Sequence, residues 1–187
     1  QEVQRLATLL SDYRTFARPQ RLNLRRADVT QIIEEVLSAQ LPMYRATKIA
    51  LQTQLENLPA MLVDPEKIKQ VILNLCKNAV EAMPNGGSLT VKATGSEGGV
   101  ILEVTDTGEG IAHGVDVFQL FRTTKPEGTG LGLPIVQQII SDHKGTITYR
   151  SEIGKGTTFT IVLPVGILNE GDAKTELSND SSLTRNL

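Results

Sequence analysis

Two asparagines stand four residues apart in a helical segment where an apolar residue would pack at less cost. Asn74 and Asn78 belong to the run NLCKNAVEAM, and Lys77 and Glu81 share their helical face. Amide oxygens are hard ligands suited to Mg²⁺, which combines few protein ligands with water and phosphate oxygens. Lys77 could then reach a phosphate. The helix alone nevertheless favours the alternative, a polar edge whose buried amide is hydrogen-bonded to backbone.

A second motif, VTDTGEGI at residues 104–111, places a carboxylate and two glycines after a hydrophobic strand. The Asp106 carboxylate can accept a hydrogen bond from an exocyclic amine such as that of adenine. Gly108 and Gly110 allow the backbone to close over a flat ligand and tolerate positive φ angles. An ordinary Asp-Gly turn explains the same residues equally well.

In the third motif, KPEGTGLGLPIV, the glycines Gly128, Gly130 and Gly132 precede a helix. Free N–H groups and the positive end of the helix dipole favour phosphate there. The dinucleotide-binding fingerprint is not met, because FRTTKPE stands where a strand should precede the glycines. Lys125 adds a mobile cation just before them.

The segment VFQLFRTTK carries Phe118 and Phe121, whose spacing could anchor a flexible lid by its apolar side. Plain core packing is the alternative for both rings. A fourth motif, GKGTTF at residues 154–159, predicts a tight hairpin turn that leads into a strand.

Apolar periodicity places these motifs on helices and strands. The expected helices span residues 1–17, 27–46, 63–83 and 131–145. The expected strands span residues 48–55, 88–95, 98–108, 146–152 and 157–164. Asp28 or Thr30 should cap the second helix and Asp64 the third. Because most strands pair as hairpins with helices on one face, we predict an α+β fold, an α/β sandwich.

Composition excludes several classes of function. The net charge is −2, the basic residues are scattered and Trp is absent, so no nucleic-acid surface is expected. The single cysteine, Cys76, cannot form an internal disulfide, which fits a reducing, cytoplasmic setting. No apolar run approaches the length of a membrane span. The chain begins at Gln1 in the middle of a pattern, so we expect it to be cut from a longer protein.

In their order and spacing, the motifs resemble the N, G1, F, G2 and G3 boxes of sensor histidine kinases. The wider superfamily includes gyrase, the mismatch-repair ATPase and the heat-shock chaperone ATPase. The resemblance covers residues 28–164, and FARP at 16–19 is most similar to the nitrogen-regulation type. It implies a Bergerat-type ATP-binding fold, a mixed sheet backed by three helices. Residues 1–19 would be the second helix of a truncated dimerisation hairpin, followed by a linker at 20–27 and, at 165–187, a polar tail expected to be disordered.

The resemblance also implies roles for single residues. Asn78 would give its amide oxygen to Mg²⁺, and Asp106 would bind the adenine amine. Asn74 and Lys125 would be catalytic by positioning phosphates. Gyrase-like relatives carry a Glu at the position of Asn74, and an Asn cannot act as that general base, which suggests phosphoryl transfer rather than fast hydrolysis. The implied ATP-binding residues are Asn74, Lys77, Asn78, Asp106, Gly108, Gly110, Ile111, Lys125, Gly128, Thr129, Gly130, Leu131, Gly132, Leu133 and Thr157.

The chain departs from the family pattern in two places. Arg122 replaces the second Phe of the family's Phe-Phe-Thr-Thr-Lys lid. Neither His113 nor His143 has the context of the phosphoacceptor, and His143 is expected to cap a helix. The implied partners are therefore a phosphoacceptor helix of the same or a partner subunit and a cognate response regulator. The parent protein is expected to be a homodimer.

Three functions remain open on the sequence. The first is the catalytic part of a histidine kinase, which transfers the γ-phosphoryl group of ATP to a histidine on a separate helix and so feeds a response-regulator aspartate. The second is a serine-directed kinase or slow ATPase on the same scaffold, which the FARP helix disfavours. The third is a nucleotide-gated protein-binding module whose lid orders on ATP.

Overall fold

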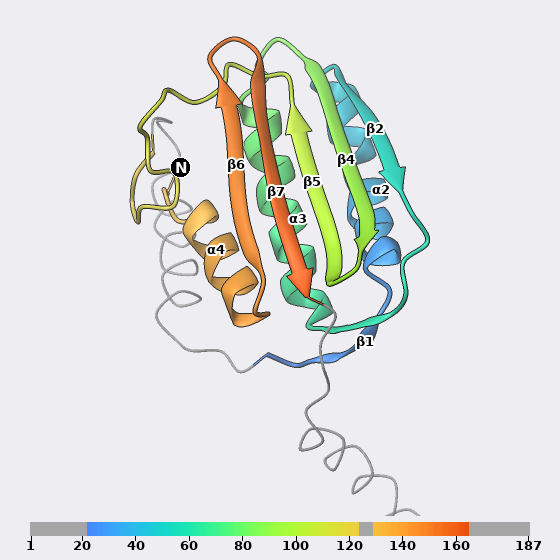
Figure 1. The fold of residues 1–187 in the computed structure, drawn as a ribbon. Coiled ribbons are helices and arrows are strands. Elements are labelled where there is room, and N and C mark those ends of the chain that lie inside the picture. Colours follow the sequence, from blue (N-terminus) through green and yellow to red (C-terminus); the bar gives the residue numbers. More distant parts are fainter. Residues whose placement is uncertain (1–21, 124–128, 165–187) are drawn as a thin grey trace, which may run out of the picture.

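The computed structural model describes residues 22–123 and 129–164, which form a mixed five-stranded sheet with helices on one face (Figure 1). The sheet strands are β2 (Ile49–Leu55), β4 (Gly87–Ser96), β5 (Gly99–Asp106), β6 (Thr146–Glu152) and β7 (Gly156–Pro164). The helices are α2 (Val29–Ala46), α3 (Pro65–Glu81) and α4 (Gly132–Asp142). The predicted α/β sandwich is thus confirmed. The predicted helix at 1–17 and the tail from 165 lie outside the described residues.

The strands lie in the order β2-β4-β5-β7-β6. β2 runs parallel to β4, and every other neighbouring pair is antiparallel. The connection from β2 to β4 contains α3, and the connection from β5 to β6 contains α4. Among the described residues, no helix has both the length and the apolar character needed to cross a membrane.

The alternation of residues along β5 explains why one face of the sheet is buried. Val100, Leu102 and Val104 are buried under the helices, whereas the residues between them are half-buried on the other face. The last inward position is Asp106, which is only 5% exposed. A carboxylate therefore stands where an aliphatic residue would complete the core.

Helix α3 begins as its sequence predicts. The Asp64 carboxylate accepts hydrogen bonds from the backbone nitrogens of Glu66, at 3.1 Å, and Lys67, at 3.2 Å. Pro65 occupies the first turn, where its missing N–H costs nothing. The stripe that α3 buries consists of Ile68, Val71, Ile72, Leu75, Cys76 and Ala79. The helix is therefore held by a cap at its start and by apolar packing along its length.

Asp64 also joins α3 to distant parts of the chain. Its second carboxylate oxygen accepts from the backbone nitrogen of Asn23 at 2.9 Å. Its own backbone nitrogen donates to Nε2 of His143 at 3.0 Å. Nδ1 of His143 lies 2.8 Å from the carbonyl oxygen of Ile139, so Nδ1 carries the ring proton. The expected capping role of His143 on α4 is confirmed, and the same ring ties α4 to the start of α3.

Two local features differ from the expectation. Strand β1 (Arg25–Ala27) pairs with β3 (Met61–Val63), although the first was expected to be linker and the second was not expected as a strand. Strands of three residues are too short to show a period in the sequence. Helix α4 ends at Asp142 rather than at Gly145, because Lys144 adopts a left-handed φ of 61°.

The single cysteine is part of the core. Cys76 is 1% exposed on α3 and lies close to the buried hydroxyl of Tyr44. Burial raises the pKa of the Cys76 thiol to about 11 and also raises the pKa of Tyr44. Both groups therefore stay protonated near neutral pH, and the thiol is a poor nucleophile there.

We expect Asp64→Ala to lower the free energy of unfolding by about 2–3 kcal/mol, because it removes a helix cap and the bond to Asn23 together. Asp28→Ala is the matched control, since within the described residues the Asp28 carboxylate accepts from the backbone nitrogens of Thr30 and Gln31 and joins no distant segment. That variant should lose about 1 kcal/mol. Urea unfolding followed by circular dichroism measures both. Equal losses in the two variants would contradict the joining role of Asp64.

Candidate functional site

Asp106 ends β5 in a fixed orientation. Its Oδ1 atom accepts hydrogen bonds from the backbone nitrogens of Gly108, at 2.8 Å, and Thr157, at 3.2 Å. The local Asp-Gly turn is therefore real, yet the carboxylate is buried rather than solvated as in most turns. A buried carboxylate held by backbone donors is well placed to recognise a ligand that carries N–H groups.

Asp106 is the first member of a polar row that crosses three neighbouring strands. In the sheet register Asp106 of β5 lies opposite Thr157 of β7, and Thr157 lies opposite Ser151 of β6. The hydroxyls of Thr157 and Ser151 are 2.9 Å apart. Thr157 is among the residues predicted from the sequence, whereas Ser151 is not. Its signal was the period of β6, where Ile147 and Tyr149 mark the inward positions that Ser151 continues.

The backbone that follows Asp106 runs from one end of this polar row to the other. At its far end, the nitrogen of Ile111 donates to the hydroxyl oxygen of Ser151 at 2.8 Å. Between them, the nitrogen of Glu109 donates to the carbonyl of Ala82 at 3.1 Å, just beyond α3. Gly110 has a φ of +73°, and a Cβ there would collide with the backbone of Glu152. The expectation of positive φ in this motif is confirmed.

The helical face of Asn74, Lys77, Asn78 and Glu81 forms as predicted. Lys77 is exposed, and its Nζ lies 3.9 Å from Oε1 of Glu81. Nδ2 of Asn74 donates to the carbonyl oxygen of Gly132 at 3.4 Å, a weak bond to backbone. Nδ2 of Asn78 is buried, and no residue in the described ranges provides it with a hydrogen-bond partner. A structural role therefore fits Asn74 in part and leaves the amide of Asn78 unexplained.

The first turn of α4 is open to an anion. No side chain from residues 22–123 or 129–164 caps the helix, which begins after the buried Leu131. The nitrogen of Leu131 lies 3.4 Å from the hydroxyl of Thr129. Gly130 takes a φ of +68°, and a Cβ at Gly132 would meet no atom within 4 Å. Leu133 is half-buried in the same turn. Backbone N–H groups at an uncapped helix start suit phosphate.

Helix α3 links the polar row to this turn. Asn78 lies one helical turn after Asn74, which contacts Gly132, and one turn before Ala82, which contacts the segment at Glu109. The Asn78 amide therefore lies between the polar row and the first turn of α4. The structure thus brings most of the predicted residues together. Lys125 and Gly128 lie outside the described residues.

The two phenylalanines before the glycines have different surroundings. Phe118 packs edge-on against Tyr149, with ring centroids 6.2 Å apart, whereas Phe121 is 59% exposed. Core packing thus explains Phe118 and leaves Phe121 without a packing role in the described part of the chain. Arg122, the departure from the family pattern, donates from its guanidinium to the exposed side chain of Gln119 at 3.2 Å and from its backbone nitrogen to the Gln119 carbonyl at 3.4 Å.

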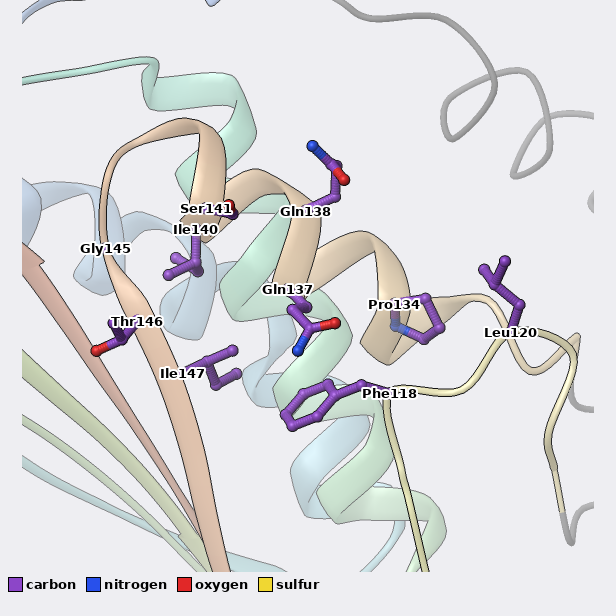
Figure 2. A pocket seen from close by; sticks show the side chains of 10 residues that line it. All are labelled: Phe118, Leu120, Pro134, Gln137, Gln138, Ile140, Ser141, Gly145, Thr146 and Ile147. Carbon is purple, nitrogen blue, oxygen red and sulfur yellow. The ribbon is translucent and has the colours of Figure 1, made fainter.

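A separate hollow of about 510 Å³ lies beside Phe118, between α4 and β6 (Figure 2). Phe118 and Leu120 line one side of it, and Pro134 and Gln137 of α4 line another. None of its lining residues is charged, and none belongs to the predicted ATP-binding set. The hollow is therefore distinct from the polar row and from the asparagine face of α3.

Comparison with known proteins identifies the family of this chain from its sequence and from its fold. The family model for histidine kinase-, DNA gyrase B-, and HSP90-like ATPases matches residues 63–167, more than half of the chain. The sensor histidine kinase ZraS of Escherichia coli (strain K12) is 40% identical over 169 residues, which cover 89% of this chain and 36% of ZraS. This chain thus spans about a third of that relative. The nitrogen-regulation subtype stays a prediction.

Solved structures of histidine kinases share the fold. Full-length ShkA in complex with AMPPNP matches with a TM-score of 0.77 and 28% identity, over 85% of this chain and 35% of that one. Histidine kinase ThkA in complex with the response regulator protein TrrA matches with a TM-score of 0.76 and 25% identity, over 88% of this chain and 48% of that one.

We expect Asn78→Ala to change the free energy of unfolding by less than about 1 kcal/mol. The substitution removes a buried amide nitrogen that has no partner in the described ranges, and alanine has the higher helix propensity. Leu75→Ala in the same helix is the control and should cost about 2–5 kcal/mol, because it empties part of the core. Urea unfolding compares the two. A cost at Asn78 similar to that at Leu75 would mean that the amide serves the fold.

Proposed function

Because this chain belongs to the family of histidine kinase-, DNA gyrase B-, and HSP90-like ATPases, we propose that it is the ATP-binding catalytic part of a sensor histidine kinase. The single observation that carries the proposal is the position of Asn78 on α3. One turn to either side of it, the helix contacts the segment that covers Asp106 and the open first turn of α4. A bound nucleotide needs a base site, a metal ligand and a phosphate site in that order. Asp106, Asn78 and the first turn of α4 would provide them.

The base would bind at the polar row. Asp106 would accept a hydrogen bond from the exocyclic amine of adenine, with Gly108, Gly110 and Ile111 shaping the pocket and Thr157 beside it. The bonds from Gly108 and Thr157 to the Asp106 carboxylate support this assignment, because they fix the acceptor before a ligand arrives.

The metal implied by the family is Mg²⁺, and Asn78 suits it. Among the described residues, Nδ2 of the buried Asn78 amide has no hydrogen-bond partner, so the fold does not account for this amide. An amide oxygen at this position would be a suitable hard ligand. Bound there, Mg²⁺ would neutralise charge on the ATP phosphates. Lys77 and Lys125 would contact the same phosphates. The backbone N–H groups around Gly130, Leu131 and Gly132 would cover them.

The position next to the metal ligand favours transfer over hydrolysis. Asn74 has no basic group, and its amide already reaches the carbonyl of Gly132. It can position phosphates, as Lys125 can, but it cannot remove a proton from water. A site without a general base would keep ATP intact until an acceptor arrives.

The acceptor would be a histidine outside this chain. The sequence contains two histidines, and His143 uses one ring nitrogen toward Ile139 and the other toward Asp64. His113 is exposed in a loop and lacks the sequence context of an acceptor. The partners we propose are a phosphoacceptor helix of the same or another subunit and a response regulator, in a homodimeric parent that uses cytoplasmic ATP.

Two other functions use the same site. A serine-directed kinase or slow ATPase would need the same nucleotide pocket but a different acceptor. A nucleotide-gated binding module would bind ATP and transfer nothing. The histidine kinase is preferred over an ATPase because Asn74 cannot act as the general base that hydrolysis needs. It is preferred over a serine-directed kinase because the FARP motif resembles the hairpin of histidine kinases.

The nucleotide site can be tested by calorimetric titration of ATP with Mg²⁺ and with EDTA. We expect Asp106→Asn to weaken binding by about tenfold or more, because the amide oxygen would keep the two backbone donors and the NH2 group would face the amine of adenine, donor against donor. Asn78→Ala should bind ATP equally with Mg²⁺ and with EDTA. Asp142→Asn, an exposed aspartate at the end of α4, is the matched control and should bind as the wild type does. A wild-type chain that binds no ATP would refute the proposal.

The transfer reaction separates the three functions. We expect labelled ATP to leave no label on this chain alone, and to label a separate phosphoacceptor-hairpin protein added to it. Phosphohistidine is lost in acid whereas phosphoserine survives, so the label should disappear on acid treatment. Acid-stable label would favour the serine-directed kinase. Binding of ATP with no transfer to any acceptor hairpin would favour the binding module.

A further inference from the structure

Ser151 is a hydrogen-bonding junction behind the polar row. Its hydroxyl oxygen lies 2.8 Å from the nitrogen of Ile111, 3.0 Å from the carbonyl oxygen of Gly156 and 2.9 Å from the hydroxyl of Thr157. It belongs to none of the motifs that point to the nucleotide. Three partners around one hydroxyl nevertheless restrict where its single proton can be.

Only one arrangement of protons satisfies all three contacts. A serine hydroxyl has one proton and two lone pairs. The Ile111 nitrogen can only donate and the Gly156 carbonyl can only accept, so the Ser151 proton goes to Gly156. The remaining lone pair of Ser151 must then accept the proton of the Thr157 hydroxyl. Thr157 therefore has no proton left for a ligand.

The consequence is a pocket edge made of acceptors. Thr157 is 4% exposed and Asp106 5% exposed, and the two lie opposite each other on adjacent strands. With its proton directed at Ser151, the Thr157 hydroxyl presents only lone pairs to a base, as the Asp106 carboxylate does. A 6-amino purine offers N–H groups to such an edge, whereas a 6-oxo purine offers a repelling oxygen.

We propose that Ser151 is a positioning residue that makes the site select 6-amino over 6-oxo purines by fixing the direction of the Thr157 hydroxyl. This inference rests on the proposed nucleotide site. It assigns part of the base specificity to a residue that does not touch the base. Without Ser151, the Thr157 proton is released, and the hydroxyl can rotate and donate to the oxygen of a 6-oxo purine.

The test is to titrate ATP and inosine triphosphate into the wild-type 187-residue chain and into Ser151→Ala. In the wild type, the dissociation constant of inosine triphosphate should exceed that of ATP. We expect the ratio of these two constants to fall by about tenfold in the variant, because inosine gains one neutral hydrogen bond. Ser151→Thr keeps a hydroxyl and should keep the wild-type ratio. The ratio is the informative quantity, because loosening of Ile111 alone would weaken both nucleotides equally.

Two controls isolate the Thr157 hydroxyl. Thr105→Val breaks a similar hydroxyl pair, Thr105 with Thr158 at 3.0 Å, on the opposite face of the same sheet, and should leave the ratio unchanged. In a Thr157→Val background, Ser151→Ala should have no further effect on the ratio, since there is no proton left to release.

The outcomes separate this inference from the proposed function. A wild type that binds ATP through Asp106, with a ratio that Ser151→Ala does not change, overturns the inference and leaves the nucleotide site intact. A wild type that binds no nucleotide overturns both. The wild type provides an independent check. It should bind inosine triphosphate more weakly than the triphosphate of unsubstituted purine riboside, because the latter has no 6-oxygen to be repelled. Equal or tighter binding of inosine triphosphate would show that the edge does not repel a 6-oxo group and would refute the inference.

Discussion

The contact between α3 and α4 is the constraint on which the rest of the site depends. Two polar contacts mark the ends of this packed interface, Asn74 to Gly132 at one end and Asp64 to His143 at the other. Ten residues of α3 span about 15 Å, and the eleven-residue step along α4 spans a similar length. The two contacts are therefore compatible only with one antiparallel register. That register places the phosphate end of the site at a fixed position along the helix that carries Asn78.

The site is costly to the fold in several places, and these are the places where the ligand is expected. In the part of the chain that the structure describes, the buried Asn78 nitrogen lacks a partner, the start of α4 has no side-chain cap, and Phe121 is exposed. Each feature would be improved by an ordinary substitution if stability were the only demand. Apolar packing along α2, α3 and the inward face of the sheet offsets these costs. The core thus supplies the stability that the site gives up.

Periodicity and caps were sufficient to predict the main elements. The stripe from Ile68 to Ala79, the Asp64 cap and the alternation in β5 are local signals, so they can be seen in the sequence. The pairing of β1 with β3 could not be predicted, because its register depends on residues that lie far apart in the chain. Asn74, Asn78 and Asp106 could be selected by residue type and spacing. Their arrangement around one helix required the contacts at Ala82 and Gly132.

Ser151 shows why residue type and distance do not fully describe a binding site. A hydroxyl can donate or accept, so Thr157 alone gives no preference between an amine and a carbonyl oxygen. The preference arises one strand further away, where a backbone N–H and a backbone carbonyl leave Ser151 only one way to pair. Backbone groups cannot change their roles, so they can impose a direction on a chain of hydroxyls. In this fold the edge strand β6 therefore contributes to the chemistry of the base site without reaching the base.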